Sequence, residues 1–325
     1  MGDATRTKRR RTDDADTPAT PLVRSTEYWF DDGNIILQVE STQFRVAKSV
    51  LSRHSSVFRD MLMMPLPADE PTVENCPVVV LSGDTAQDWT LFLEAMYPKS
   101  LMEEVPRFEL IAAILRLSKK YECPAFRQDC VRRLKTKFPT TLEEYDELEP
   151  WTCIKGNKNI YLPILRFARE IGLHSIIPLI YCHMLTLSRG RYMPKILNVD
   201  DASLGASDRF ACLLGIANLQ ILQSTTTMAW LEVDLPSSAL PAQNCLQPAR
   251  CVAMVKETIL EAASTHPPSL CVISEWNETW GVGMCRPCEK KAKDVFEAGR
   301  EECWDKLPSM FGLPEWKELM SNDFE

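Results

Sequence analysis

The sequence predicts an α+β domain followed by an all-helical lobe. Two observations in its 325 residues support this prediction. Near residue 34 the apolar residues form short strand-like runs, whereas from Val50 they recur at intervals of three and four, as on one face of a helix. Beyond residue 160 helical spacing continues, without comparable strand alternation. With 45% hydrophobic residues, a chain of this length is expected to form about two domains.

The first element predicted is a β-hairpin. Asn34 to Val39 is rich in β-branched and apolar residues and follows Gly33, and the polar stretch Glu40 to Gln43 precedes Phe44, where the apolar pattern resumes. The next element is a helix, because the following apolar positions fall on one helical stripe. These positions are Val50, Leu51, His54, Val57, Phe58, Met61 and Leu62.

A further strand and three helices complete the predicted domain. Pro77 to Leu81 is the strand, and Asp84 with Gln87 three positions later forms a capping box that begins a helix. One face of that helix carries Trp89, Phe92, Leu93, Met96 and Tyr97. The other two helices span 108–121 and 124–138, the second with Pro124 at an acceptable first-turn position.

Phe44, Lys48, Leu51, Ser55 and Phe58 match a family pattern, Phe-x-x-His-Lys-x-x-Leu-x-x-x-Ser-x-x-Phe. In this order of residues the chain resembles the BTB (POZ) family over about 24–138. The resemblance implies a small mixed sheet with flanking helices, and it also leads us to expect that this chain forms a homodimer in the family's manner. Family members dimerise through their first hairpin and helix, so the same region supplies the expected interface or core residues. These are Ile35, Leu37, Val50, Leu51, Phe58 and Met61.

Departures from the family pattern affect the expected partners. Asn34 stands where the family usually has Asp, and Ala47 where it usually has His, which argues against a charged corepressor groove. Relatives that recruit a cullin ubiquitin ligase carry a hydrophobic-x-acidic motif, and Trp89-Thr90-Leu91 stands at that place without the acid. A cullin substrate adaptor remains one alternative function. A BTB transcription regulator is another, although the chain lacks histidine pairs at the spacing of two-Cys two-His zinc fingers.

The second half of the chain is predicted to be helical. Residues 139–159 are acidic and suggest a linker, and 160–325 form the helical domain with a Cys-rich segment. Helices are expected over 162–171, ending at Gly172, and over 175–187, 207–223 and 248–263. The expected core stripe of the third comprises Phe210, Leu213, Leu214, Ala217 and Ile221. This region is similar to that of BTB proteins numerous in mushroom-forming fungi.

Four cysteines form the best candidate site for chemistry. Cys245 and Cys251 are followed about thirty residues later by Cys285 and Cys288, and four thiolates can hold zinc tetrahedrally. Such a zinc ion would be structural, because four protein ligands leave no open position for a substrate water. Two other interpretations stay open: Cys285 and Cys288 as a redox pair, and all four as small buried hydrophobes.

Composition restricts the partners and the compartment. The net charge of −8 argues against nucleic-acid binding, and the most apolar run, 176–187, is shorter than the roughly 20 residues of a membrane span. Residues 1–23 are expected to be a disordered tail without an export signal. An intracellular protein in nucleus or cytoplasm follows, with Lys8 to Arg11 either a nuclear import signal or a solvated charged stretch.

Signatures of common enzymes were not found in the sequence. Neither a Gly-x-Ser-x-Gly elbow, a Walker loop nor a His-Glu-x-x-His pair occurs, and the four histidines are few. The sequence therefore predicts a non-enzymatic interaction module that self-associates and recruits a partner protein.

Overall fold

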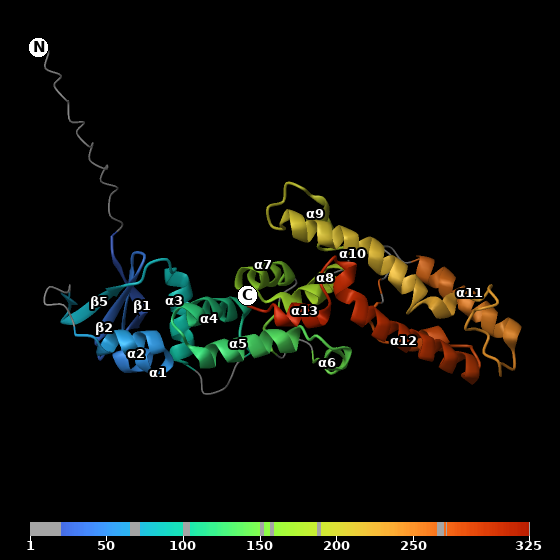
Figure 1. The fold of residues 1–325 in the computed structure, drawn as a ribbon, viewed down its shortest axis with the longest axis horizontal. Coiled ribbons are helices and arrows are strands. Elements are labelled where there is room, and N and C mark those ends of the chain that lie inside the picture. The colour runs from blue at the N-terminus through green and yellow to red at the C-terminus, as the bar shows by residue number, and fades with distance from the viewer. Residues whose placement is uncertain are drawn as a thin grey trace, which may run out of the picture. The chain divides into compact units, whose positions relative to one another are not determined.

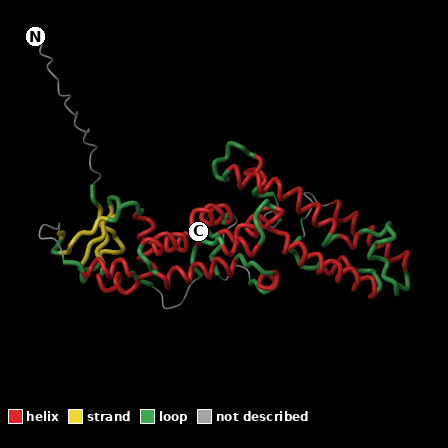
Figure 2. Tube along the Cα trace, viewed as in Figure 1, coloured by secondary structure: helices red, strands yellow, loops and turns green. Residues whose placement is uncertain are grey.

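The computed structural model describes residues 21–65, 72–99, 105–149, 153–156, 159–186, 190–264, 270 and 272–324. Lys8 to Arg11 lie outside them. Contacts between Cα atoms divide the chain into two compact units, the first comprising Met1–Leu101 and Leu117–Pro124 and the second Met102–Arg116 and Ala125–Glu325. Strands occur only in the first unit of the described chain, and the second is helical (Figures 1 and 2). The domain boundaries at 138 and 159 stay predictions.

A five-stranded mixed sheet forms the centre of the first unit, in the order β1-β3-β2-β5-β4. Its strands are β1 (Val23–Trp29), β2 (Ile35–Val39), β3 (Thr42–Val46), β4 (Thr72–Val73) and β5 (Cys76–Val80). The predicted hairpin is confirmed, because β2 and β3 pair in antiparallel register from Ile35 opposite Val46 to Val39 opposite Thr42. The predicted strand after it is β5, which runs parallel to β2. The sheet is therefore the small mixed sheet that the resemblance implies.

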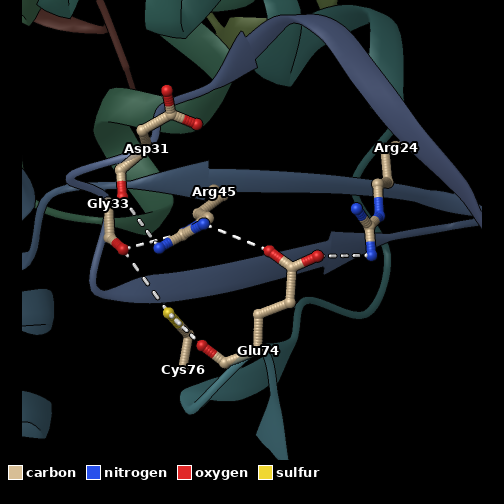
Figure 3. Close-up of polar contacts among 6 residues, drawn as sticks. All are labelled: Arg24, Asp31, Gly33, Arg45, Glu74 and Cys76. Carbon is tan, nitrogen blue, oxygen red and sulfur yellow. Dashed lines mark hydrogen bonds and ion pairs between the residues drawn. The ribbon is translucent and has the colours of Figure 1, made fainter.

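Polar contacts join the edge strands of this sheet (Figure 3). Arg45 of β3 donates hydrogen bonds to the carbonyl oxygens of Gly33 and Asp31, at 2.9 Å each. Its guanidinium also pairs with Glu74 at 3.1 Å, and the other carboxylate oxygen of Glu74 pairs with Arg24 of β1 at 2.7 Å. Glu74 lies in the tight turn between β4 and β5, so one carboxylate links β1, β3 and this turn.

Ser55 breaks the single helix that the apolar spacing predicted into α1 (Lys48–His54) and α2 (Ser56–Met63). Its backbone is extended, with φ −126° and ψ 125°, and its hydroxyl accepts a hydrogen bond from the backbone N–H of Phe58. The same hydroxyl donates to the carbonyl oxygen of Tyr121 at 2.5 Å. The serine of the family pattern thus acts as the N-cap of α2, a role that satisfies one otherwise unpaired donor.

The helix α3 (Ala86–Met96) follows β5, but the predicted capping box at Asp84 and Gln87 is wrong. Thr85 is the N-cap and accepts a hydrogen bond from the backbone N–H of Asp88. Asp84 is instead turned inward, where its side chain is 4% exposed. Its carboxylate accepts hydrogen bonds from Trp89 Nε1 at 2.9 Å, from Lys120 Nζ at 2.6 Å and from the hydroxyl of Tyr121.

These partners control the charge of Asp84. Burial alone would raise the pKa of the carboxyl group, but the hydrogen bonds from Lys120, Trp89 and Tyr121 and the charge of Lys120 outweigh it, so the pKa lies below its ordinary value of 3.8. Because the pKa of Asp84 is lower in the folded chain than in the unfolded chain, its carboxylate stabilises the fold at pH values above the pKa of the unfolded chain. This contribution is lost as the pH falls through the pKa of the folded chain.

We expect the substitution Asp84→Asn to reduce the free energy of unfolding at neutral pH by about 2 kcal/mol, the usual size of a hydrogen-bonded charge. It should also flatten the decline in stability between about pH 5 and pH 3, because the titrating group is gone. Urea unfolding of the intact chain across this range measures both effects. Asp60→Asn is the matched control, since Asp60 is exposed and 4.0 Å from Arg59. If the free energy of unfolding depended on pH equally in the two variants, the stabilising role assigned to Asp84 would be contradicted.

The second unit is built from helices. Its N-terminal part contains most of α4 (Phe108–Lys120) and of α5 (Pro124–Lys137), then α6 (Leu142–Asp146), α7 (Tyr161–Ile171), α8 (Ile177–Leu185) and α9 (Met193–Leu197). Its C-terminal part contains α10 (Ala206–Thr225), α11 (Pro248–Ser264), α12 (Arg286–Met310) and α13 (Trp316–Ser321). Gly172 ends α7 in the left-handed conformation, with φ 72°, as predicted. The predicted acidic linker contains α6, whose Asp146 pairs with Arg300 of α12 at 2.5 Å.

The buried face of α10 differs from the predicted stripe. Phe210 and Ile221 are 67% and 65% exposed. The buried positions are Arg209, Ala211, Cys212, Gly215, Leu219 and Leu222. This face lies along α12 (Figure 1), and Gly215 directly faces the ring of Phe311, which leaves no room for a Cβ. α10 therefore carries apolar residues on two faces, only one of which is covered within the described chain.

Candidate metal centre and interaction surface

The four predicted cysteines come from three segments of the second unit. Cys245 lies in the irregular segment before α11, and Cys251 lies in the first turn of that helix. Cys285 is the N-cap of α12, in extended conformation, and Cys288 lies in the first turn of α12. The first turns of two helices and one loop therefore supply the thiols.

The structure brings all four sulfur atoms into one group. They lie within 4.8 Å of one another, and the Sγ atom of Cys245 is 3.7 Å from that of Cys251 and 3.6 Å from that of Cys285. Two backbone donors point into the group: the N–H of Ala242 donates to Cys288 Sγ and that of Cys285 to Cys251 Sγ, both at 3.4 Å. Such N–H groups stabilise negative charge on sulfur.

The protonation of these thiols differs with their surroundings. The backbone N–H of Cys288 is the main cause that lowers the pKa of Cys285, to about 7, with hydrogen bonds from neighbouring thiols adding to it. Burial is the main cause that raises the pKa of Cys251 and of Cys288. Without a cation among them, four thiolates this close repel one another. A bound metal ion reverses this balance, because it deprotonates a coordinating thiol outright.

An aromatic cluster, which the sequence analysis did not identify, supports the cysteines. Trp230, Trp276 and Trp280 lie with ring centroids 5.2 to 6.1 Å apart, and Phe296 of α12 lies 5.5 Å from both Trp276 and Trp280. The cluster includes the buried Cys251 and Cys288. The spacing of Trp276 and Trp280, four residues apart and just before Cys285, is the signal that could have indicated it.

This group of residues can hold a metal ion. Its donors are all thiols, which suit Zn²⁺ and other thiophilic ions and not Mg²⁺ or Ca²⁺, because the latter prefer oxygen ligands. Four protein donors complete a tetrahedron, so a metal here would be structural.

The six predicted interface residues fall into two classes. Ile35, Leu37, Leu51 and Phe58 are buried within the first unit and belong to its core. Phe58 packs on Trp89 and Tyr121, with ring centroids 5.9 and 4.9 Å apart. Trp89 and Leu91, at the place of the family's cullin motif, are buried as well.

Val50 and Met61 remain partly accessible, and neighbouring apolar residues extend them. We call the residues Val50, Val57, Met61, Met63 and Met64 the α1–α2 patch; all are exposed or half-buried. Val57 and Met61 are four residues apart and therefore lie on one face of α2, and Met64 follows directly after the end of that helix. The sequence analysis missed Met63 and Met64, because the apolar stripe that it followed ended at Leu62.

No helix among the described residues has the length and apolar character needed to cross a membrane.

Comparison with protein families gives one match. The model of the family described as BTB/POZ domain matches residues 30–138. No curated protein matches the chain. Domains of this family generally serve as protein-interaction modules and commonly dimerise.

Proposed function

From the BTB/POZ domain that residues 30–138 form, we propose that this chain is a non-enzymatic interaction module that self-associates and recruits a partner protein. The observation that carries the proposal is the α1–α2 patch, on helices next to the hairpin of the matched region. In the family's manner, two copies would cover this patch by placing the same surface of each copy against the other around a two-fold axis.

Burial of the patch supplies the driving force for self-association. Exposed methionine and valine side chains gain about 25 cal/mol for each Å² of apolar surface removed from water. Obligate interfaces bury on the order of 2,000 Å² or more, so neighbouring parts of the domain must contribute to the contact. Methionine also adapts its shape to a facing surface, which suits a patch that contains three of them.

Sedimentation velocity of the intact chain tests the proposal. We expect a dimer at micromolar concentration. A strictly monomeric species over this range would contradict self-association, even though the BTB fold would stand.

The outward face of α10 supports partner recruitment. Phe210, Leu213 and Ile221 are exposed there, and the segment 210–231 contains no charged residue although 25% of the whole chain is charged. Exposed apolar surface of this kind usually marks an interaction site. The test is affinity capture of the intact protein followed by mass spectrometry. A Phe210→Glu and Ile221→Glu variant should lose partners that the wild type and a Gln220→Glu control retain.

We also propose that the protein contains a structural zinc ion. We assign zinc to the four-cysteine group because sulfur ligands in tetrahedral number are its usual structural environment. Elemental analysis of the purified chain should give about one zinc per chain, and none in a Cys288→Ala variant. The support for a non-enzymatic role is that a zinc ion held by four protein ligands would have no open coordination position for a substrate water.

A further inference from the structure

The four thiols differ in their access to solvent. Cys251 and Cys288 are 1% and 0% exposed, whereas Cys245 and Cys285 are half-buried. Of the four residues, Cys245 and Cys285 are therefore the two that a small reagent in solution can approach. These two residues belong to different segments, one before α11 and one at the start of α12.

The sulfur atoms of Cys245 and Cys285 are also close together. Cys245 Sγ and Cys285 Sγ lie 3.6 Å apart, and a disulfide requires about 2.05 Å, so they need to approach by roughly 1.5 Å. Cys245 lies in a loop, and Cys285 precedes the first turn of α12, where its backbone is extended. Cys288 is less available as a partner, because its sulfur is buried and accepts the N–H of Ala242.

We propose that Cys245 and Cys285 are a peroxide-sensitive pair, and that their oxidation to a disulfide releases the metal ion from the four-cysteine group. This inference rests on the structural zinc proposed above. It differs from the pairing of Cys285 with Cys288 that the sequence alone offered, because the accessible neighbour of Cys285 comes from a segment forty residues away in the chain.

The chemistry uses one equivalent of hydrogen peroxide. The Cys285 thiolate attacks one peroxide oxygen, the O–O bond breaks, and a sulfenic acid and hydroxide form, the latter leaving as water after it takes a proton. The Cys245 sulfur then attacks the sulfenic sulfur and displaces its hydroxyl group as a second water. The two sulfurs together lose two electrons and hydrogen peroxide gains them. A zinc ion held by the four cysteines would keep its charge and would be released, because only two of its four ligands would remain.

The test applies hydrogen peroxide to the intact, zinc-loaded chain. Released zinc is measured with a chromogenic chelator, and remaining thiols are blocked with N-ethylmaleimide before digestion and mass spectrometry. We expect about one zinc released per disulfide formed, and the disulfide to join the peptides of Cys245 and Cys285. Thioredoxin or dithiothreitol with added zinc should restore the metal-bound form.

Two variants sharpen this experiment. Cys245→Ala should leave Cys285 as a sulfenic acid, which dimedone traps, and Cys212→Ala should behave as the wild type because Cys212 is a buried cysteine outside the group. A disulfide between Cys285 and Cys288, or zinc loss without any disulfide, would overturn the inference. The metal content measured before peroxide is added tests the zinc assignment separately. If that assignment fails, the disulfides that peroxide forms in the metal-free, reduced chain still decide which cysteines pair.

Discussion

Removal of the metal from the intact chain is expected to unfold the part of the second unit that surrounds the four cysteines. The proposed ion would link the first turns of α11 and α12 to the loop of Cys245, and the aromatic cluster around Trp230 packs on these segments. Structural zinc contributes roughly 10–16 kcal/mol of apparent binding free energy in zinc-finger peptides. Here the aromatic cluster supplies part of the stability, so we expect a loss of several kcal/mol.

The pair of variants Cys288→Ala and Cys212→Ala isolates the contribution of the metal. Both remove a cysteine that is 0% exposed, so the cost of the lost sulfur is similar, but only Cys288 belongs to the four-cysteine group. Tryptophan fluorescence during urea unfolding reports on the cluster. Zinc should stabilise the wild type and the Cys212→Ala variant and leave Cys288→Ala unchanged. Equal stabilities of the two variants in the presence of zinc would contradict a structural metal.

Charge placed in the α1–α2 patch is expected to convert the proposed dimer into a monomer. A variant with Val57→Glu and Met61→Glu would bring like charges together across a two-fold interface, where their repulsion and desolvation cost several kcal/mol. Since each 1.4 kcal/mol is a tenfold change in Kd, we expect the dimer to weaken at least about a hundredfold. Val57 is exposed and Met61 half-buried, so the fold itself should persist.

Arg59→Glu is a charge-matched control for this experiment. It also changes the net charge by −2, on the same helix, but at an exposed position that is not part of the patch. Sedimentation equilibrium measures the dissociation constant of each protein, and circular dichroism checks that the helices remain. If both variants dissociate equally, general charge repulsion is the cause; if neither does, the dimer uses another surface.

Several features of this protein follow from the local sequence. The hairpin around Glu40 and the stop of α7 at Gly172 each depend on a few consecutive residues, and the structure has both where the pattern placed them. The four cysteines could be chosen from their spacing along the chain, because the ability to bind zinc through sulfur is a property of the residue type. Periodicity also identified α10 as a helix from Ala206 to Thr225, within two residues at either end.

The tertiary structure decided which face of each element is covered. Phe210 and Ile221 fit a core stripe as well as Leu219 and Leu222 do, and packing against neighbouring helices, among them α12 and α8, selected the latter. The break at Ser55 likewise depends on a hydrogen bond to Tyr121, 66 residues away. Periodicity is a property of one segment, whereas burial and the meeting of Cys245 with Cys285 are properties of pairs distant in sequence. For that reason the sequence determined the elements and the reactive residues, and the fold determined their partners.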